Sequence, residues 1–385
     1  MTGSGPRVVV TSAYFEPGYK AGGPIPSVKQ IVSSAEGIRI LLLTNDRDLG
    51  DTAPYPGLSG RTVTRGDLDI LYLDRRRPGH WWRAIKTIRG GPVDLLYVNS
   101  LWDPWFTILP LLLSVLRVVP ARRVLVAPRG ELSAGALSIK ARKKKVVKPV
   151  LRALLGVLRP SWHASSAMDE ADIRRAFGAD RRVFVVSESS PHVPSTAPLE
   201  PRPGPVRLVF VSRIVPMKNL LTVLAALGHV RGPAALDVYG PVEDGEYWRR
   251  CQEAIAALPP GVTVEYRGVV TPAEVADTFA RYDAFVLPTL GENFGHVIAE
   301  SLSVGCPVIC SDRTPWSACL AAGGGEVLPD LTPPAVAAVL DRWLALSVDE
   351  RVGRRRQARD AYASWLAEQS GPGVLALALT TPAAR

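Results

Sequence analysis

The sequence Arg207-Leu-Val-Phe-Val-Ser-Arg-Ile-Val-Pro-Met-Lys-Asn219 places a short apolar run directly before a polar loop. Its first six residues, Arg207–Ser212, are typical of a strand that is buried on both faces of a parallel sheet. Similar runs recur downstream and are separated by helical stretches. They are Ala234–Tyr239, Val262–Tyr266, Ala284–Leu287 and Pro307–Ile309. This alternation predicts a doubly wound α/β domain.

The first half of the chain shows the same alternation of apolar runs and helical stretches. Its strand candidates are Arg7–Ser12, Ile38–Thr44, Asp69–Leu73, Asp94–Val98, Arg122–Ala127 and Arg182–Val186. Between the halves, six prolines within Ser187–Arg207 exclude a helix or a central strand. We therefore predict a Rossmann-like domain over 1–187, a linker over 188–206 and a second Rossmann-like domain over 207–365, facing each other across a central cleft.

The C-terminal tail, about 366–385, contains a small apolar run, Val374–Leu379, directly after a Gly-Pro-Gly break. Glycine and proline at these positions end the preceding helix. We expect the tail to pack back on the first domain.

The composition is that of a globular protein, with 47% apolar and 21% charged residues in a chain of 385. The most apolar run, Trp105–Leu116, is shorter than the roughly 18–20 residues of a membrane-spanning helix. The N-terminus lacks the charged and apolar regions of a signal peptide. These features predict a cytoplasmic protein.

Four cysteines occur without a C-x-x-C pair or a matching histidine spacing. This pattern favours reduced, buried thiols over zinc ligands or disulfides. The net charge of +10 suits an anionic partner. Nucleic acid, acidic lipid and nucleotide phosphates all remain candidates.

The segment Glu292-Asn-Phe-Gly-His-Val-Ile-Ala-Glu300 follows the strand candidate Ala284–Leu287. A loop at the carboxyl end of a parallel strand is where open α/β sheets bind ligands. Glu292 and the amides of Phe294 and Gly295 can therefore meet a sugar. Glu300, two turns further along and on the same side, can accept hydrogen bonds from a ribose diol. The alternative is a helix cap followed by a solvated glutamate.

Arg213 and Lys218 lie five residues apart after the first strand of the second domain. Fixed cations at this position stabilise the pyrophosphate oxyanion that forms when a sugar leaves a nucleoside diphosphate. Such a site needs no metal. An exposed basic loop is the alternative, and the position after the strand favours the binding site.

A second glycine-containing loop, Tyr19-Lys-Ala-Gly-Gly-Pro-Ile-Pro26, follows the first strand candidate. Gly22 and Gly23 let the backbone approach a phosphate or sugar without a Cβ in the way. An ordinary surface turn remains the alternative. No G-x-G-x-x-G follows this strand, which argues against nicotinamide and flavin cofactors.

Together, the Arg-x4-Lys segment, Glu292-x7-Glu300 and Gly305-Cys-Pro-Val-Ile-Cys-Ser-Asp-Arg-Thr-Pro-Trp316 resemble the retaining glycosyltransferases of family 4 (glycosyl transferases group 1), which have the GT-B fold. The segments 127–137 and 162–170 are similar to its bacterial polysaccharide and natural-product branch. The resemblance covers most of the chain.

The resemblance implies that the domain over 1–187 lies on the acceptor side and that the domain over 207–365 binds the nucleotide-sugar. It implies catalytic roles for Arg213, Lys218 and Glu292. It also implies that the donor is bound by Gly22, Gly23, Ser212, Asn293, Phe294, Gly295 and Glu300. Two family features are missing. Arg129 or Glu131 takes the place of a histidine in a loop of the first domain, and Ser187–His192 replaces a Pro-Asn-Gly turn.

Two Asp-x-Asp matches, Asp46-Arg-Asp48 and Asp67-Leu-Asp69, are interpreted as chance matches in acidic loops rather than as a metal site. We expect no metal and no other cofactor besides the nucleotide-sugar co-substrate.

The basic stretch Lys140–Arg152 interleaves cations with Val and Leu. Peripheral contact with an anionic inner membrane and a solvated helix face are equally compatible with it. The tryptophans are candidates for an acceptor groove or for the core. They are Trp81, Trp82, Trp102 and Trp105.

The sequence thus predicts transfer of a sugar from a UDP- or GDP-sugar to a hydroxyl acceptor, such as a glycan, a lipid-linked glycan or a small natural product. A nucleotide-sugar epimerase or hydrolase with the same diphosphate site is the first alternative. A basic nucleic-acid-binding protein is the second, although we expect no nucleic-acid partner.

Overall fold

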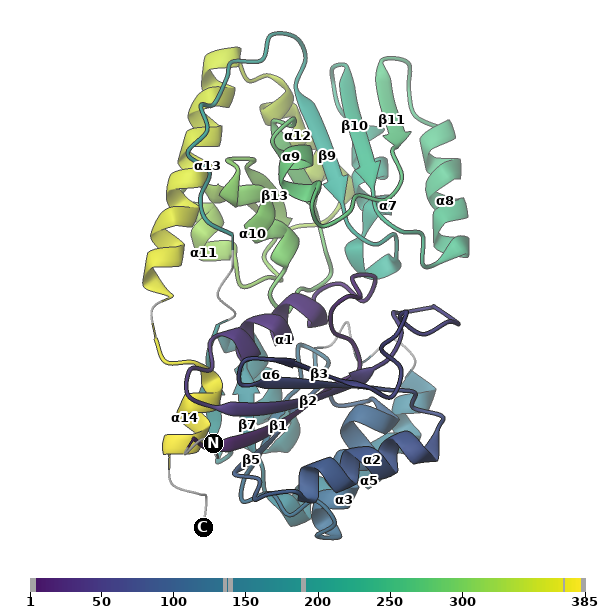
Figure 1. The fold of residues 1–385 in the computed structure, drawn as a ribbon. Coiled ribbons are helices and arrows are strands. Elements are labelled where there is room, and N and C mark those ends of the chain that lie inside the picture. Colours follow the sequence, from purple (N-terminus) through teal and green to yellow (C-terminus); the bar gives the residue numbers. More distant parts are fainter. Residues whose placement is uncertain (1–4, 134–136, 138–140, 188–191, 370, 382–385) are drawn as a thin grey trace. The chain divides into compact units, whose positions relative to one another are not determined.

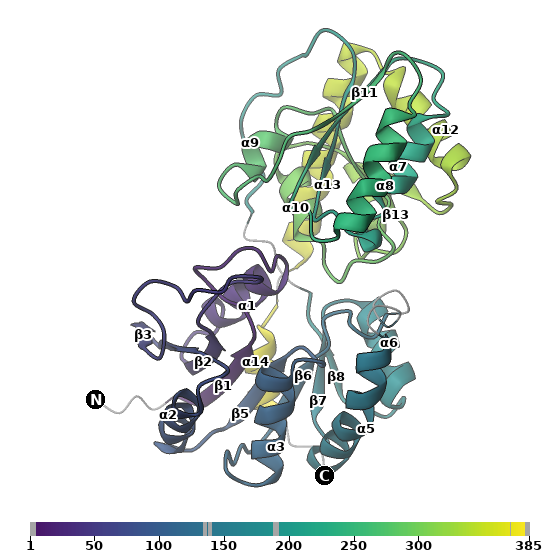
Figure 2. The ribbon, with the colours of Figure 1, turned by 90° about the vertical axis from the view of Figure 1, so that its right-hand side faces the viewer.

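In a computed structural model, the chain folds into two α/β units (Figures 1 and 2). The structure describes residues 5–133, 137, 141–187, 192–369 and 371–381, with the backbone alone for 141–146. Described residues up to 187 and from 371 onward make up the first unit, and residues 192–369 make up the second. Each unit is built around its own sheet.

The sheet of the first unit has the strand order β3-β4-β2-β1-β5-β6-β7-β8, in which only β3 runs antiparallel to its neighbour. Its apolar runs are buried on both faces, as their composition predicts. The strands are β1 (Arg7–Ser12), β2 (Arg39–Asn45), β3 (Thr62–Arg65), β4 (Leu68–Leu73), β5 (Leu95–Asn99), β6 (Val124–Ala127), β7 (Ser161–Ala164) and β8 (Val183–Val185).

Helices cover both faces of this sheet. One face packs on α1 (Pro24–Ser33) and α14 (Val374–Thr380). The other packs on α2 (Pro78–Arg89), η1 (Pro104–Ile108), α3 (Leu109–Val115), α5 (Ala141–Leu158) and α6 (Ala167–Phe177). The side chains of Val374, Leu375 and Ala378 are buried, and Arg123 donates a 3.2 Å hydrogen bond to the carbonyl oxygen of Ala378. The apolar run of the tail is therefore part of the first unit's core.

The second sheet is entirely parallel, with the strand order β11-β10-β9-β12-β13-β14. Its strands are β9 (Arg207–Val211), β10 (Ala234–Tyr239), β11 (Val262–Tyr266), β12 (Ala284–Leu287), β13 (Val308–Ser311) and β14 (Gly325–Leu328). Short helical turns η2 (Pro216–Lys218), α11 (Ser317–Cys319) and η3 (Leu320–Gly324) lie in its loops.

The longer helices of this unit pack around the sheet in two groups. Helix α7 (Leu220–Leu227) contacts α8 (Gly245–Ala256) and α12 (Pro333–Leu344). Helix α10 (His296–Ser303) contacts α9 (Val275–Phe279) and α13 (Val348–Glu368). The doubly wound α/β architecture predicted for both halves is confirmed. None of the described helices is both long and apolar enough to cross a bilayer.

Candidate functional site

The strand order of the second sheet reverses between β9 and β12, because β10 lies on one side of β9 and β12 on the other. In an open α/β sheet, the carboxyl ends of the strands at such a reversal bind ligands. The loop after β9 contains Arg213 and Lys218, and the loop after β12 contains Glu292. The topology thus brings the predicted residues to one edge of the sheet.

Hydrogen bonds join these two loops. The N–H of Leu290 donates to the carbonyl oxygen of Met217 at 2.8 Å, and the Thr289 hydroxyl donates to the same oxygen at 3.1 Å. In return, the side-chain amide of Asn219 donates to the carbonyl oxygen of Pro288 at 3.0 Å. Asn219 has a left-handed backbone (φ 61°), which asparagine tolerates better than most residues. The joined loops hold their side chains in fixed positions.

Lys218 and Glu292 form an ion pair between the two loops. The Nζ atom of Lys218 donates a hydrogen bond to Oε1 of Glu292, and the two side chains are only 12% and 10% exposed. Such shielding from water strengthens their attraction but leaves either charge costly if the other is removed. The residues predicted to hold the diphosphate and the transferred sugar are therefore direct neighbours.

Arg213 is paired with a carboxylate that the sequence analysis missed. Its Nη1 atom lies 2.9 Å from Oε2 of Glu243, which follows β10. The Arg213 side chain is 40% exposed, so it can turn toward a ligand at little cost. Each of the two cations thus has a carboxylate partner from another loop.

Gly240 allows the loops after β9 and β10 to approach closely. Its φ is +136°, and a Cβ there would lie 1.8 Å from the carbonyl oxygen of Ser212. The N–H of Ser212 donates to the carbonyl oxygen of Tyr239 at 3.0 Å. Ser212, predicted to bind the donor, is therefore held by its backbone at the start of the loop.

The side chain of Phe294 points into the core rather than toward a ligand. It is 3% exposed, and its ring packs on those of Trp316 and Trp365 at centroid distances of 5.2 and 6.0 Å. Its carbonyl oxygen also accepts a hydrogen bond from Nε1 of Trp316. What Phe294 can offer to a sugar is its backbone N–H, as the sequence analysis proposed.

Helix α10 begins at His296, after Gly295 in a left-handed conformation (φ 83°). The first N–H groups of a helix have no partner inside it and favour anionic ligands. Asn293 lies in the loop just before this turn. Because Glu292 precedes the helix, the expectation that it shares a helix face with Glu300 is wrong. Glu300 lies on α10, and its Oε1 atom is 3.4 Å from Nε2 of His192.

In the first unit, the predicted glycine loop follows β1. Gly22 has a φ of +67° and no atom within 4 Å of the place where a Cβ would be, and Gly23 directly precedes α1. The Asp48 carboxylate accepts hydrogen bonds from the N–H groups of Tyr19 and Lys20 at 2.7 and 2.9 Å. One aspartate of the first Asp-x-Asp match therefore shapes the glycine loop.

The other aspartates with described side-chain contacts also bind neighbouring residues. Asp46 accepts from the Ser59 hydroxyl at 2.5 Å and from Arg47 at 2.9 Å, and Asp69 accepts from the Thr64 hydroxyl at 2.6 Å. These contacts give the aspartates structural roles.

Arg129 and Glu131 stabilise the loops after β5 and β6. Arg129 donates to the side-chain oxygen of Asn99 and to the Tyr97 hydroxyl, both at 2.7 Å. Glu131 accepts from the N–H of Leu101 at 2.6 Å and from the Ser100 hydroxyl at 3.0 Å. Arg129 thus contacts β5 itself, and Glu131 contacts the loop that follows it.

This polar cluster also reaches β7 and α6. The Tyr97 hydroxyl lies 2.9 Å from Nδ1 of His163, and the Asp169 carboxylate accepts from the N–H groups of Gly130 and Ser165, both at 3.2 Å. Burial raises the pKa of Asp169, partly offset by these backbone donors. Hydrogen bonding explains why such polar residues are buried here.

The basic stretch lies on α5. Lys140 and the side chains of 141–146 lie outside the described part of the chain, whereas Lys148, Val150 and Arg152 are exposed. Of the tryptophans proposed for an acceptor groove, Trp82 is 72% exposed, and Trp81 is buried and stacked on Trp105 with ring centroids 6.3 Å apart. Trp102 is partly buried in the loop after β5.

Burial sets the chemistry of the cysteines. All four are buried and free, and burial raises the pKa of the Cys306 thiol to about 12. A thiol with such a pKa stays protonated near neutral pH and is a poor nucleophile.

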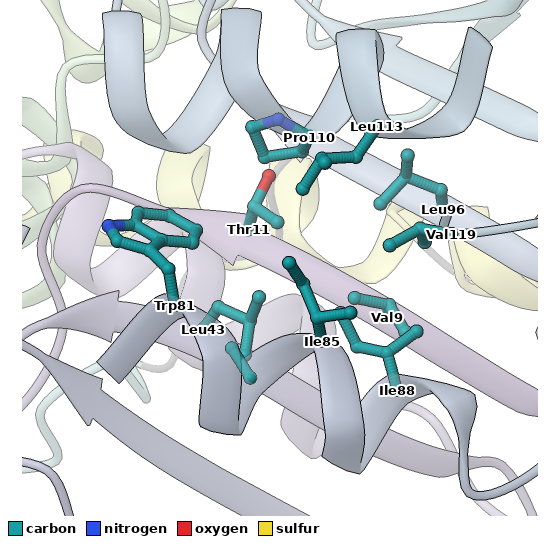
Figure 3. A pocket seen from close by; sticks show the side chains of 11 residues that line it. Val9, Thr11, Leu43, Trp81, Ile85, Ile88, Leu96, Pro110, Leu113 and Val119 are labelled. Atoms are coloured by element: carbon teal, nitrogen blue, oxygen red, sulfur yellow. The ribbon is translucent and has the colours of Figure 1, made fainter. Parts of the chain in front are cut away.

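A cavity of about 10 Å³ lies between the first sheet and helices α2 and α3 (Figure 3). Apolar side chains such as Val9, Leu43, Ile85 and Leu113 line it. It has room for about one water molecule, so it is a gap in the core rather than a sugar site.

Comparison with known protein families gives a match within the second unit. Residues 196–361 match the family model of glycosyl transferases group 1. This range contains the loops after β9 and β12 and helix α10. No curated protein sequence matches the chain.

Solved structures match over almost the whole chain at low sequence identity. Sucrose-phosphate synthase from Thermosynechococcus elongatus has a TM-score of 0.71 and 18% identity, over 97% of this chain and 96% of that chain. HepE of Anabaena, in complex with UDP and glucose, has a TM-score of 0.66 and 14% identity, over 97% of both chains. WaaG, a glycosyltransferase involved in lipopolysaccharide biosynthesis, has a TM-score of 0.65 and 14% identity, over 97% of this chain and 100% of that chain. The chain has the GT-B fold.

Proposed function

We propose that the protein is a retaining, metal-independent glycosyltransferase that moves a sugar from a nucleoside-diphosphate sugar to a hydroxyl acceptor in polysaccharide or natural-product glycoside synthesis. The group 1 domain and the GT-B fold support a glycosyltransferase. The observation that carries the proposal is the shielded Lys218–Glu292 pair at the strand-order reversal, with Arg213 on the same loop as Lys218.

In the proposed step, the acceptor hydroxyl oxygen forms a bond to the anomeric carbon while the bond from that carbon to the β-phosphate oxygen breaks. The electron pair of the broken bond stays on the diphosphate, which also takes the acceptor proton. Arg213 and Lys218 stabilise the negative charge that grows on the diphosphate. Since both cations have carboxylate partners in the free protein, the diphosphate displaces Glu243 from Arg213 and shares Lys218 with Glu292.

Glu292 has a second role in this proposal. Once the diphosphate binds Lys218, the Glu292 carboxylate can accept hydrogen bonds from the hydroxyls of the transferred sugar. The backbone N–H groups at the start of α10 complete the sugar site. Glu300 accepts hydrogen bonds from the ribose of the donor.

We take UDP-sugars as the first donors to test and GDP-sugars as the second. HepE was solved in complex with UDP and glucose, and an E. coli trehalose-6-phosphate structure was solved bound with UDP-2-fluoro glucose. The latter matches 98% of this chain and 99% of that chain, with a TM-score of 0.66 and 12% identity.

We further propose that α5 brings the protein to the anionic inner face of a membrane. Its described exposed side chains include Lys148 and Arg152 beside Val150 and Val157. Cations beside apolar side chains suit an interface of anionic headgroups and acyl chains. A lipid-linked acceptor would then lie at the same surface.

A donor-turnover assay tests the proposed function. The full chain is incubated with a panel of UDP- and GDP-sugars, with and without hydroxyl acceptors, and nucleotide release and the products are measured by chromatography and NMR. A glycosyltransferase requires an acceptor and gives a glycoside, whose anomeric configuration reports retention. Release without an acceptor would favour a hydrolase, and an isomerised donor an epimerase. If wild-type protein neither binds nor consumes any donor but binds DNA or RNA, the proposal is wrong.

Removing bound metal with a chelator tests whether turnover is independent of metal. Turnover is measured after dialysis against EDTA and again with added Mg²⁺ or Mn²⁺. We expect equal rates, because Arg213 and Lys218 supply the positive charge. A rate that collapses with EDTA and returns with the metal would contradict this part of the proposal.

A further inference from the structure

The first described segment of the second unit, residues 192–204, is bound along one face of α13. The residues that hold it are spaced by four, four and three positions, so they lie on one side of the helix. Each donates a hydrogen bond to a backbone carbonyl oxygen of residues 192–204. They are Arg351 to Gly204 at 2.9 Å, Arg355 to Glu200 at 3.3 Å, Arg359 to Ser195 at 3.0 Å and Tyr362 to His192 at 2.8 Å. We call residues 192–204 the strap.

Two of these donors are cations in the interior. Arg351 and Arg355 are 5% and 3% exposed, and burial lowers the pKa of Arg355. Arg351 also lies 3.4 Å from the buried carboxylate of Asp283. Buried cations are costly unless they are paired and hydrogen-bonded, so their use here indicates that the path of the strap is closely specified.

The strap leads to the proposed ribose site. Nε2 of His192 lies 3.4 Å from Oε1 of Glu300, the carboxylate expected to accept the ribose hydroxyls. Three residues further on, the N–H of Ser195 donates to the carbonyl oxygen of Ser303 at 2.7 Å, and the Ser303 hydroxyl donates to the carbonyl oxygen of Glu300 at 2.8 Å. A backbone hydrogen bond between the strap and the end of α10 thus accompanies the side-chain contact of His192 with Glu300.

We propose that His192 is a positioning residue that orients the Glu300 carboxylate for the 2′- and 3′-hydroxyls of the donor ribose. A pair with both side chains partly exposed contributes little to folding stability, so its main effect is on the direction of the carboxylate. With Oε1 directed at His192, Oε2 and the remaining lone pairs stay available to a diol. This inference rests on the proposed function, because it takes Glu300 as the ribose contact.

The inference predicts a change in specificity rather than a general loss of binding. Without the imidazole, Glu300 has more freedom and makes weaker hydrogen bonds to the ribose. A donor nucleotide that lacks the 2′-hydroxyl depends less on this carboxylate. Loss of His192 should therefore weaken UDP binding more than 2′-deoxy-UDP binding.

The test is calorimetric titration of UDP and 2′-deoxy-UDP into the full-length protein. The variants are His192→Ala, His192→Gln, Glu300→Ala and the His192→Ala/Glu300→Ala double variant. His229→Ala, an exposed histidine after α7, is the matched control. We expect His192→Ala to weaken UDP binding by about fivefold and to leave 2′-deoxy-UDP binding almost unchanged.

The Gln variant retains an N–H donor and should restore most of the preference for UDP. In the double variant, the loss should not exceed that of Glu300→Ala alone, because the two residues act through one contact. Equal losses for both nucleotides in His192→Ala, or losses that add in the double variant, would overturn the inference. If the wild-type protein binds neither UDP nor GDP, the proposed function itself fails. If it binds only GDP, the same titrations are carried out with GDP and 2′-deoxy-GDP in place of UDP and 2′-deoxy-UDP.

Discussion

Nζ of Lys218 donates a hydrogen bond to Oε1 of Glu292 across 74 positions of sequence. Lys218 ends the turn η2 after β9, and Glu292 follows β12. The pair therefore exists because β9 and β12 are neighbours in the sheet. It joins the proposed diphosphate and sugar sites in one contact, and it makes the two residues interdependent in stability as well as in activity.

The first prediction concerns this interdependence. Lys218→Met leaves the Glu292 carboxylate shielded without its cation, and Glu292→Gln does the converse for Lys218. We expect each single variant to lower the free energy of unfolding by about 1–3 kcal/mol, and the double variant to lose less than the sum of the two. Denaturant unfolding curves give the free energy of unfolding of the wild-type protein, the two single variants and the double variant. Strictly additive losses would show that the pair has no net coupling.

The second prediction concerns Arg213→Ala. The side chain is 40% exposed, so its removal should leave the melting temperature nearly unchanged. Loss of one cation facing the leaving diphosphate should lower kcat by roughly 10²–10³-fold. Arg231→Ala is the matched control, since Arg231 is 93% exposed and contacts Asp341 at 3.7 Å. Full activity in Arg213→Ala would show that Arg213 does not stabilise the leaving diphosphate.

The third prediction concerns Glu243, which competes with the diphosphate for Arg213 in our proposal. Glu243→Gln removes the competing charge, so the affinity for UDP or GDP should rise, by up to about fivefold if the ion pair is worth up to ~1 kcal/mol. The gain should shrink at high salt, which screens exposed charges. Calorimetric titration at low and high ionic strength measures both effects. Weaker nucleotide binding in this variant would mean that Glu243 supports the site rather than competing for it.

The sequence predicts the positions of the two cations and Glu292 because parallel sheets follow strong rules. Apolar runs such as Val209–Val211 mark buried strands, and the loops at their carboxyl ends form the binding edge. Neither rule needs knowledge of side-chain contacts. The placement of Arg213, Lys218 and Glu292 at one edge of the sheet therefore follows from the parallel direction of the strands, whereas the direct contact of Lys218 with Glu292 depends on β9 and β12 being neighbours.

The partners of these residues could not be predicted in the same way. Glu243 and His192 lie in irregular segments, where no periodicity indicates which way a side chain points. Strand β7 was also missed, because Ser161-Trp-His-Ala164 lacks an apolar run. His163 is buried there through its hydrogen bond to Tyr97, a contact between residues 66 positions apart.

The fourth prediction concerns the exposed cations of α5. If this helix lies on an anionic membrane, Lys148→Glu/Arg152→Glu should weaken binding to vesicles that contain phosphatidylglycerol, by about 1 kcal/mol or more for each charge. Donor turnover with a soluble acceptor should not change. Co-sedimentation with anionic and with neutral vesicles measures the effect. If wild-type protein does not bind anionic vesicles, α5 has only a solvated face.

The fifth prediction concerns Gly240, where backbone geometry supports the donor loop. A methyl group at this residue would lie 1.8 Å from the carbonyl oxygen of Ser212, and its φ of +136° is unfavourable for alanine. Gly240→Ala should therefore displace the loop that begins at Ser212, lower stability by about 2–4 kcal/mol and weaken nucleotide binding. Gly245→Ala is the matched control, because no atom lies within 4 Å of its Cβ position at the start of α8. The control should be neutral or slightly stabilising. Thermal melting without nucleotide measures the loss of stability in Gly240→Ala, and melting with UDP or GDP measures the loss of binding. A variant that melts and binds like wild type would show that the loops after β9 and β10 can move apart without cost.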